Sequence, residues 1–130
     1  MPTKVWYEPD QRFYVVEFVD DPVFDLPEWA VGKEEHWSRI SYHLFAANVD
    51  NKILFHRLAI EREHLPGETL RDDLERKLTW LIGELRYTGQ PPPEYNPTGF
   101  VSWPCLRAAE ILEAEHKALL DRLVAAAPDM

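Results

Sequence analysis

The chain has 130 residues, a formal net charge of −9, 45% hydrophobic residues and one cysteine. This length predicts a single domain, residues 1–130, with enough apolar residues for a core of its own. The acidic charge excludes the basic surface of a nucleic-acid-binding protein, and no apolar run is long enough to span a membrane. One cysteine excludes an internal disulfide and the N-terminus lacks the apolar core of a signal peptide, so we expect a cytoplasmic protein.

Two segments near the N-terminus, residues 5–7 and 13–19, are rich in aromatic and β-branched residues. The turn-forming residues 8–11 separate them, so the pattern predicts a β-hairpin. The second strand carries apolar side chains on both alternating faces, which is typical of a strand covered from both sides.

Residues 20–33 contain two prolines and a glycine, which predicts an irregular strap. Two structures are compatible with the next part of the chain. Residues 38–47 and 52–60 can form a second hairpin around the turn-forming residues 48–51, or helices with apolar stripes can run through residues 34–65. We favour strands, because the apolar triplets in residues 52–60 suit a doubly covered strand better than a helical stripe.

Leucines at helical spacing predict a helix that begins at Thr69 and stops at Gly89 and the prolines after it. Thr69 is a suitable N-cap, and two aspartates follow in the first turn, where negative charge is favoured. Residues 88–103 predict a stiff loop with aromatic side chains. Pro104 suits the first turn of a last helix that runs to about Ala126.

Together these elements predict an α+β fold: an antiparallel four-stranded sheet from two hairpins, followed by two helices packed on one face. The alternative is an N-terminal hairpin attached to a short four-helix bundle. In the favoured fold the second sheet face also needs a cover. The 20–37 strap, the 88–103 loop or a second copy of the chain, as a homodimer through this apolar face, are the three candidates.

The tetrapeptide EREH at residues 61–64 is echoed by EAEH at residues 113–116. A Glu and a His three positions apart on one helix can hold a metal ion together, as in di-iron helix bundles. The candidate ligands are Glu61, His64, Glu113 and His116. In a chain with 14 glutamates such an echo also arises by chance, and a strand would place positions three apart on opposite faces. A metal-binding protein or metal-dependent enzyme is therefore the alternative, and the favoured interpretation has no cofactor.

Three other residues are candidates for a site. His116 lies near the centre of the apolar stripe of the last helix, which predicts a buried, hydrogen-bonded histidine or a group that lines a pocket. A small-ligand pocket between sheet and helices, lined by His116, His43 and aromatic residues, is a further hypothesis. Cys105 is predicted to be a buried packing thiol, and we find no catalytic constellation.

Negative charge is concentrated at the N-terminal end, where residues 1–35 hold nine acidic and three basic residues. Together with the surplus of aromatic side chains, this favours a non-enzymatic protein-binding module, such as an inhibitor, immunity-type or adaptor protein, that engages a basic protein surface. The predicted contact residues are Asp20, Asp21, Asp25, Glu28, Trp29, Glu34 and Glu35. No direct contact with nucleic acid or membrane is expected.

Overall fold

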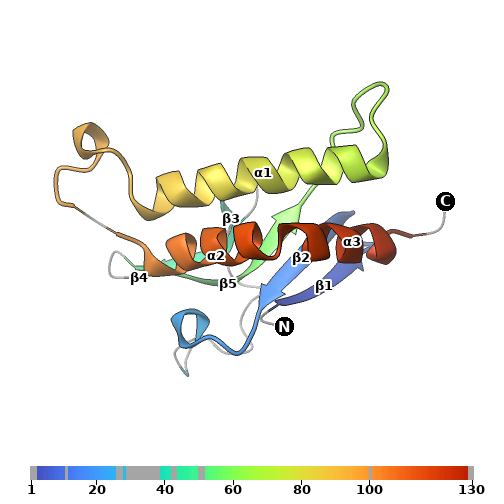
Figure 1. Cartoon of the computed structure of the whole chain (residues 1–130). Coiled ribbons are helices and arrows are strands. Elements are labelled where there is room, and N and C mark those ends of the chain that lie inside the picture. Colours follow the sequence, from blue (N-terminus) through green and yellow to red (C-terminus); the bar gives the residue numbers. More distant parts are fainter. Residues whose placement is uncertain are drawn as a thin grey trace.

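The computed structural model is an α+β protein in which an antiparallel sheet is followed by three helices that pack on it (Figure 1). The structure describes residues 3–10, 12–25, 28, 39–41, 44–49, 52–99 and 101–128. In residues 39–41, 44–49 and 52–55 it describes the backbone without the side chains. The predicted α+β class, with helices that follow the sheet and pack on it, is confirmed.

Three antiparallel strands form the part of the sheet beneath the helices: β1 (Thr3–Glu8), β2 (Phe13–Phe18) and β5 (Lys52–Ile60). On β2, Val16 lies opposite Val5 on one side and opposite Leu58 on the other. β4 (Leu44–Val49) and β3 (Arg39–Ser41) continue the sheet beyond β5, in the order β1-β2-β5-β4-β3. β5 is therefore an interior strand, with β2 on one side and β4 on the other.

The described residues between 39 and 60 are extended. β4 pairs with β5 in antiparallel fashion, with Val49 opposite Lys52. The register then shifts between Phe45 and Ala46, which makes His56 the extra residue of a bulge on β5. Because this part of the chain forms strands, the alternative prediction of a four-helix bundle is wrong.

Helix α1 (Leu70–Gly89) begins and ends where the leucine spacing predicts. The Thr69 side chain accepts a hydrogen bond from the Asp72 backbone N–H at 3.1 Å, and the Asp72 carboxylate accepts one from the Thr69 N–H at 3.3 Å. This reciprocal capping box satisfies two backbone donors at the start of the helix. The predicted N-cap is confirmed.

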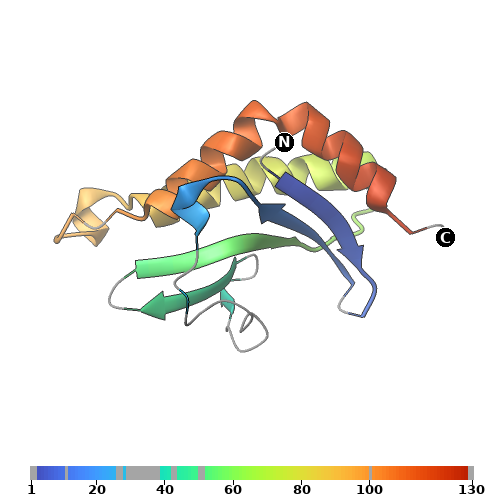
Figure 2. The ribbon, with the colours of Figure 1, turned by 90° about the horizontal axis from the view of Figure 1, so that it is seen from below.

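The last helix was predicted to be continuous, and this prediction is wrong. It is divided into α2 (Trp103–Ala114) and α3 (His116–Ala126), with Glu115 between them at φ −105° and ψ 16°. α2 contacts α1 and β5, whereas α3 contacts α1 and β1. The change of direction, visible in Figure 2, lets both helices stay on a sheet that twists beneath them.

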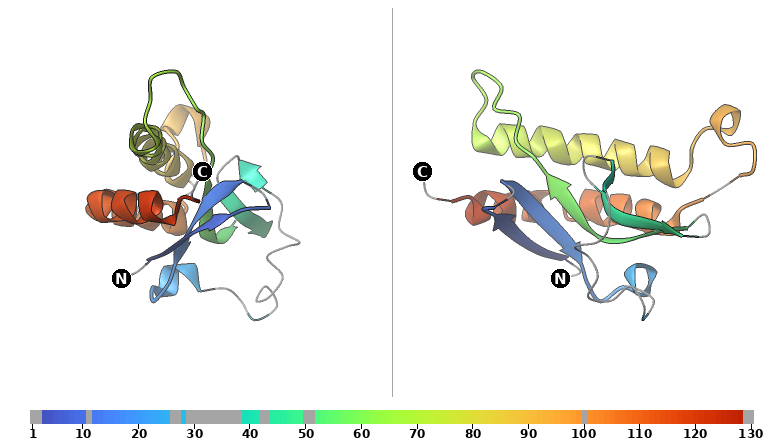
Figure 3. Two further views of the ribbon diagram at one scale, coloured as in Figure 1. Left: turned by 90° about the vertical axis from the view of Figure 1, so that its right-hand side faces the viewer. Right: turned by 180° about the vertical axis from the view of Figure 1, so that it is seen from behind.

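The side chains of β2 alternate between two apolar clusters, as the sequence predicts. Tyr14, Val16 and Phe18 belong to the main core, between the sheet and the helices. The helices lie on this one side of the sheet (Figure 3). Phe13 and Val15 point to the opposite face, where they form a smaller cluster with β5. Both residues are 3% exposed.

The aromatic loop, defined here as residues 90–102, does not cover this second face. It projects from one end of the molecule, beyond the sheet, and contains the short 3-10 helix η4 (Pro93–Tyr95) (Figures 1 and 3). Of the predicted covers, the 88–103 loop is therefore excluded. Within the strap, η1 (Pro22–Phe24) stacks Phe24 on Phe18 with ring centroids 4.5 Å apart, and residues 26–27 and 29–38 lie outside the described part.

No helix in the described part of the chain is both long enough and apolar enough to cross a membrane.

Candidate functional site

The EREH segment runs from β5 into the connection before α1, and its side chains are divided between two hollows. Glu63 lines a hollow of about 600 Å³ between β5 and α1, which we call the α1–β5 hollow. Arg62 and His64 line a second hollow of about 620 Å³ near the β1–β2 turn, which we call the hairpin hollow, and Glu61 borders both. No helix runs through this segment and His64 has a left-handed backbone, so Glu61 and His64 do not share a helical face, although both border the hairpin hollow.

A fully buried carboxylate, Asp73 in the first turn of α1, holds this segment in place. Asp73 is 0% exposed. It accepts hydrogen bonds from Nε of Arg62 at 3.3 Å, from the Glu63 backbone N–H at 3.2 Å and from a terminal nitrogen of Arg76 at 2.8 Å. A buried charge is tolerated only when it is paired and hydrogen-bonded, and these contacts meet that requirement. Asp73 thereby joins the end of β5 to the start of α1.

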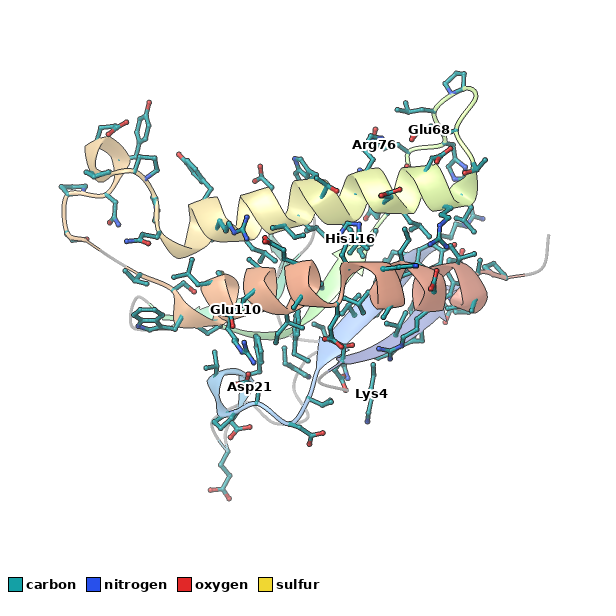
Figure 4. All side chains as sticks on the ribbon, in the orientation of Figure 1. Lys4, Asp21, Glu68, Arg76, Glu110 and His116 are labelled. Carbon is teal, nitrogen blue, oxygen red and sulfur yellow. The ribbon has the colours of Figure 1, made fainter. Side chains whose placement is uncertain are left out.

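The charged side chains of the α1–β5 hollow are paired with one another. Arg76 bonds Glu68 at 3.0 Å and Glu63 at 3.2 Å, and Lys77 bonds Glu63 from the same helix face. Figure 4 shows Arg76 and Glu68 close together at the start of α1. Lys77 and Arg76 lower the pKa of Glu63, and Glu68 in turn raises the pKa of Arg76. Trp80 closes this hollow, with the Lys77 ammonium 5.7 Å from its ring centroid.

The hairpin hollow differs, because several of its polar groups face it without a partner. Tyr7 and Tyr14 form one wall, with ring centroids 5.1 Å apart and an interplanar angle of 59°. In the part of the chain that the structure describes, no hydrogen bond or ion pair engages the phenol groups of these tyrosines, the Arg12 guanidinium or the His64 imidazole. These are the groups of the hollow that remain available to a ligand.

Two residues of the hairpin hollow have a left-handed backbone. Arg12 has φ 59° and His64 has φ 56°, a region that side chains other than glycine adopt infrequently. The Arg12 conformation closes the β1–β2 turn, where its N–H donates to the Glu8 carbonyl at 2.8 Å. In the described part of the chain, the His64 N–H makes no such backbone hydrogen bond. Strain of this sort is frequent at binding sites, where the surrounding structure maintains it.

Tyr14 is the most deeply placed polar side chain of the hairpin hollow. It is 2% exposed, and burial raises the pKa of its phenol while the nearby Arg62 acts to lower it. A buried phenol usually finds a hydrogen-bond partner. The sequence indicated only that the second strand has apolar side chains, Tyr14 among them, on both faces, and the polar end of Tyr14 became visible as part of a site in the folded structure.

The second motif, EAEH, is interrupted by the break between α2 and α3. Glu113 lies near the end of α2 and forms an ion pair with Arg86 of α1. His116 begins α3, and its Nε2 lies 4.0 Å from the Glu75 carboxylate of α1 (Figure 4). The His116 side chain is 29% exposed and points to α1, so the expectation of a fully buried core histidine is wrong.

The four predicted metal ligands thus belong to two separate arrangements. In the described ranges, no three His, Cys, Asp or Glu side chains are grouped so that they could hold a metal ion. His43 of the proposed ligand pocket lies outside the described residues. His56 lies on the bulge of β5, with Nε2 3.9 Å from the Glu17 carboxylate.

The predicted acidic contact residues have different environments. The Asp21 carboxylate is engaged in contacts within the molecule. It accepts a hydrogen bond from the Val23 N–H and forms an ion pair with Arg107 of α2 at 2.8 Å. The Arg107 hydrogen bond, followed by that from Val23, lowers the pKa of Asp21. Asp20, Asp25 and Glu28 are exposed. Trp29, Glu34 and Glu35 lie outside the described residues.

The aromatic loop is closed at its base. The Ser102 N–H donates to the Gly89 carbonyl at 2.7 Å, and a β-carbon at Gly89 would lie 2.7 Å from the Leu106 side chain. The ends of the loop are therefore held together, as in a compact Ω-loop. Tyr95 is 72% exposed and Trp103, which follows the loop, is 68% exposed. The sequence identified the loop as stiff and aromatic but not as an exposed surface.

Cys105 lies in the first turn of α2 and is fully buried, and burial raises the pKa of its thiol. The thiolate is the nucleophilic form of cysteine, so both features oppose a role as nucleophile. The predicted burial of Cys105 is confirmed.

Comparison of the chain with protein-family models, with curated proteins and with solved structures found no significant match. A fold alone does not indicate function, so function is inferred from the side chains of the site.

Proposed function

We propose that this protein is a non-enzymatic binding module for a partner protein with a basic surface. Its contact surface is the acidic end, which we define as residues 20–25 and 28 around η1, together with residues 84–99 and 101–113, which run from the end of α1 through the aromatic loop into α2. The loop and η1 lie toward the same end of the molecule in both Figure 1 and Figure 2. η1 contacts α2, to which the Asp21–Arg107 pair joins it.

The exposed aromatic side chains of this end carry the proposal. Tyr87 at the end of α1 is 52% exposed, and Tyr95 and Trp103 are exposed further. Tyr and Trp are enriched among residues that dominate binding energy at protein interfaces. The proline-rich loop, closed at its base, holds Tyr95 in place before binding, which reduces the entropy lost on association.

The charge of the acidic end supports a basic partner. Residues 20–28 and 84–113 together hold eight acidic and two basic residues. Both bases are engaged within the molecule, Arg86 by Glu113 and Arg107 by Asp21 and Glu110. Asp20, Asp25 and Glu94 are exposed. An uncompensated negative surface accelerates association with a positive one, and the effect weakens as salt is added.

The acidic end also contains a hollow. A hollow of about 530 Å³ between the end of α1 and α2 is lined by Arg86, Leu106, Glu110 and Glu113. A basic side chain of a partner can enter it and compete with Arg86 for the Glu113 carboxylate. We place this binding in the reducing cytoplasm, in line with the single buried cysteine.

Site-specific photo-crosslinking tests the proposal. A photoreactive phenylalanine is placed at Tyr95 in one variant and at Trp80 in a matched control, because Trp80 is also an exposed aromatic, 44% exposed, but lies on the α1–β5 hollow. Both proteins are irradiated in lysate at about 0.05 and 0.5 M salt, and the crosslinked species are identified by mass spectrometry. We expect a basic protein crosslinked through position 95 alone and lost at high salt.

A second arm uses Tyr95→Ser with Trp103→Ser, which removes two exposed rings without touching the core. This variant should keep its melting temperature and lose the crosslinked partner from a probe at Tyr87. Equal crosslinking from positions 80 and 95, or a partner that is acidic or insensitive to salt, contradicts the proposal.

A further inference from the structure

The hairpin hollow lies at the opposite end of the molecule from the aromatic loop. It is formed where the β1–β2 turn, the end of β5, the start of α1 and the end of α3 meet. These elements are far apart in the chain and are brought together by the fold, as Figure 3 shows for the β1–β2 hairpin and the C-terminal helix. Its volume of about 620 Å³ is in the range of small-molecule sites, about 300–1,000 Å³.

We propose that the hairpin hollow binds a small organic anion, a carboxylate or phosphate ester that carries a flat apolar group. The acid group is held by Arg12 and Arg62, and the apolar group lies against the Tyr7–Tyr14 wall. This site is independent of the proposed protein-binding surface.

The cationic groups of the hollow are placed to receive an anion. Arg62 is held by Asp73 through its Nε at 3.3 Å, so its position is fixed by a buried carboxylate while its terminal nitrogens remain to donate elsewhere. The Arg12 guanidinium has no described partner and borders the same space. A guanidinium presents parallel N–H donors that match the two oxygens of a carboxylate or phosphate. The pair therefore provides one fixed and one adaptable contact.

The Tyr7–Tyr14 wall and the apolar residues opposite it would contact the flat apolar group of the ligand. Tyr14 is 2% exposed and lines the hollow, and no described residue bonds its hydroxyl. The Tyr14 hydroxyl is open to the hollow, so a ligand oxygen can replace water as its hydrogen-bond partner. Leu70, Ala127 and Pro128 supply apolar surface opposite the tyrosine rings. An aromatic ring of a ligand finds offset-stacked or edge-to-face packing there.

The α1–β5 hollow, although similar in volume, does not offer the same chemistry. Its Arg76 and Lys77 are bonded to Glu63 and Glu68, so an anion would have to displace carboxylates that the protein already holds there. Among the described residues that line the hairpin hollow, Glu61 is the one acidic side chain, and no described contact pairs it with Arg12 or Arg62.

Amide-detected NMR titration of the folded, full-length chain tests the proposal. The probes are benzoate and phenyl phosphate, which separate the two anion types, with benzamide as the neutral isostere of benzoate and inorganic phosphate as the anion without an apolar group. We expect one or both aryl anions to shift the amides of Arg12, Tyr14 and His64. Benzamide should bind at least about ten-fold more weakly, because hydrogen bonds to a charged group are about twice as strong as those to a neutral one and the neutral amide loses this gain.

Three variants locate the binding. Arg12→Gln should weaken binding of the aryl anion about ten-fold, and Tyr14→Phe should weaken it several-fold. Both variants should keep the fold, because Arg12 is exposed and the Tyr14 variant keeps the aromatic ring. Arg71→Gln, which removes an exposed arginine of α1 paired with Asp121, is the control and should change nothing. The proposal is overturned if neither aryl anion shifts these amides at millimolar concentration, if benzamide binds equally well, or if Arg12→Gln has no effect.

Discussion

The buried carboxylate of Asp73 is the contact on which the arrangement of both hollows depends. Asp73→Asn keeps the size and shape of the side chain but removes its charge. Arg62 and Arg76 then face a neutral amide, and the Glu63 N–H loses one of its two candidate acceptor oxygens. The segment 61–64 then keeps the more exposed ion pairs of Glu63 with Arg76 and Lys77, but it loses its buried charged contact with α1.

The expected loss follows from the burial of the partners. Removing one member of a fully buried charge pair costs about 3–5 kcal/mol. Here the Arg62 and Arg76 side chains are 19% and 37% exposed, so water can partly rehydrate them. We therefore expect a loss of about 2–4 kcal/mol. With an unfolding entropy of about 2.1 cal/mol/K per residue, the melting temperature should fall by roughly 7–15 °C.

Urea unfolding followed by circular dichroism measures this loss, with a constant m-value as the check that both proteins unfold in the same way. The matched control is Asp121→Asn, because Asp121 pairs with Arg71 at 2.7 Å with both side chains about half exposed. That substitution should cost less than about 1 kcal/mol. If Asp73→Asn costs no more than Asp121→Asn, Asp73 does not anchor the segment and the reasoning fails.

Four further outcomes are expected. Gly83→Ala should raise stability by about 0.5–1 kcal/mol, because Gly83 is exposed within α1 and a β-carbon there would meet no atom within 4 Å. Gly89→Ala should lower stability by about 1–3 kcal/mol, since its β-carbon would lie 2.7 Å from a leucine side chain of α2; thermal unfolding of both variants checks the opposite signs. Arg107 lowers the pKa of Asp21 below its ordinary value of 3.8, so this pair stabilises the fold above pH of about 4 and the contribution is lost as the pH falls through the folded pKa. Asp21→Asn should therefore be less stable than the wild type at pH 7, with a difference that shrinks in acid, as measured by unfolding free energy against pH. Cys105 should react with a thiol reagent only slowly in the folded protein and rapidly in denaturant, and fast reaction without denaturant would contradict its burial.

Much of the local structure was predictable because its causes are close together in the sequence. The alternation of β2 follows from side chains two residues apart, and it correctly divided Tyr14 and Val15 between two clusters. The start of α1 follows from Thr69 and Asp72, whose side chains bond one another's backbone. Burial of Cys105 follows from the apolar spacing around it.

The candidate sites were less predictable, because their residues come from distant elements. The pattern of the last helix gave no sign of the break at Glu115, since an apolar stripe can continue across a bend that a twisted sheet imposes. The EREH echo suggested a shared helical face, yet its residues border two hollows once the segment is extended. The exposure of Tyr95 depends on where the closed loop projects, which no neighbouring residue specifies.

The sequence by itself determined the N-terminal hairpin, the capped helix and the acidic character of the protein, and it left residues 34–65 open between strands and helices. These properties depend on residue spacing, on capping groups a few positions apart and on composition. Only the tertiary structure decided that Asp73 is buried, that Arg62 and Arg12 border one space and that Asp21 is neutralised by Arg107. The physical reason is that a charge is stable in the interior only with a compensating partner, and those partners lie up to 86 positions away along the chain.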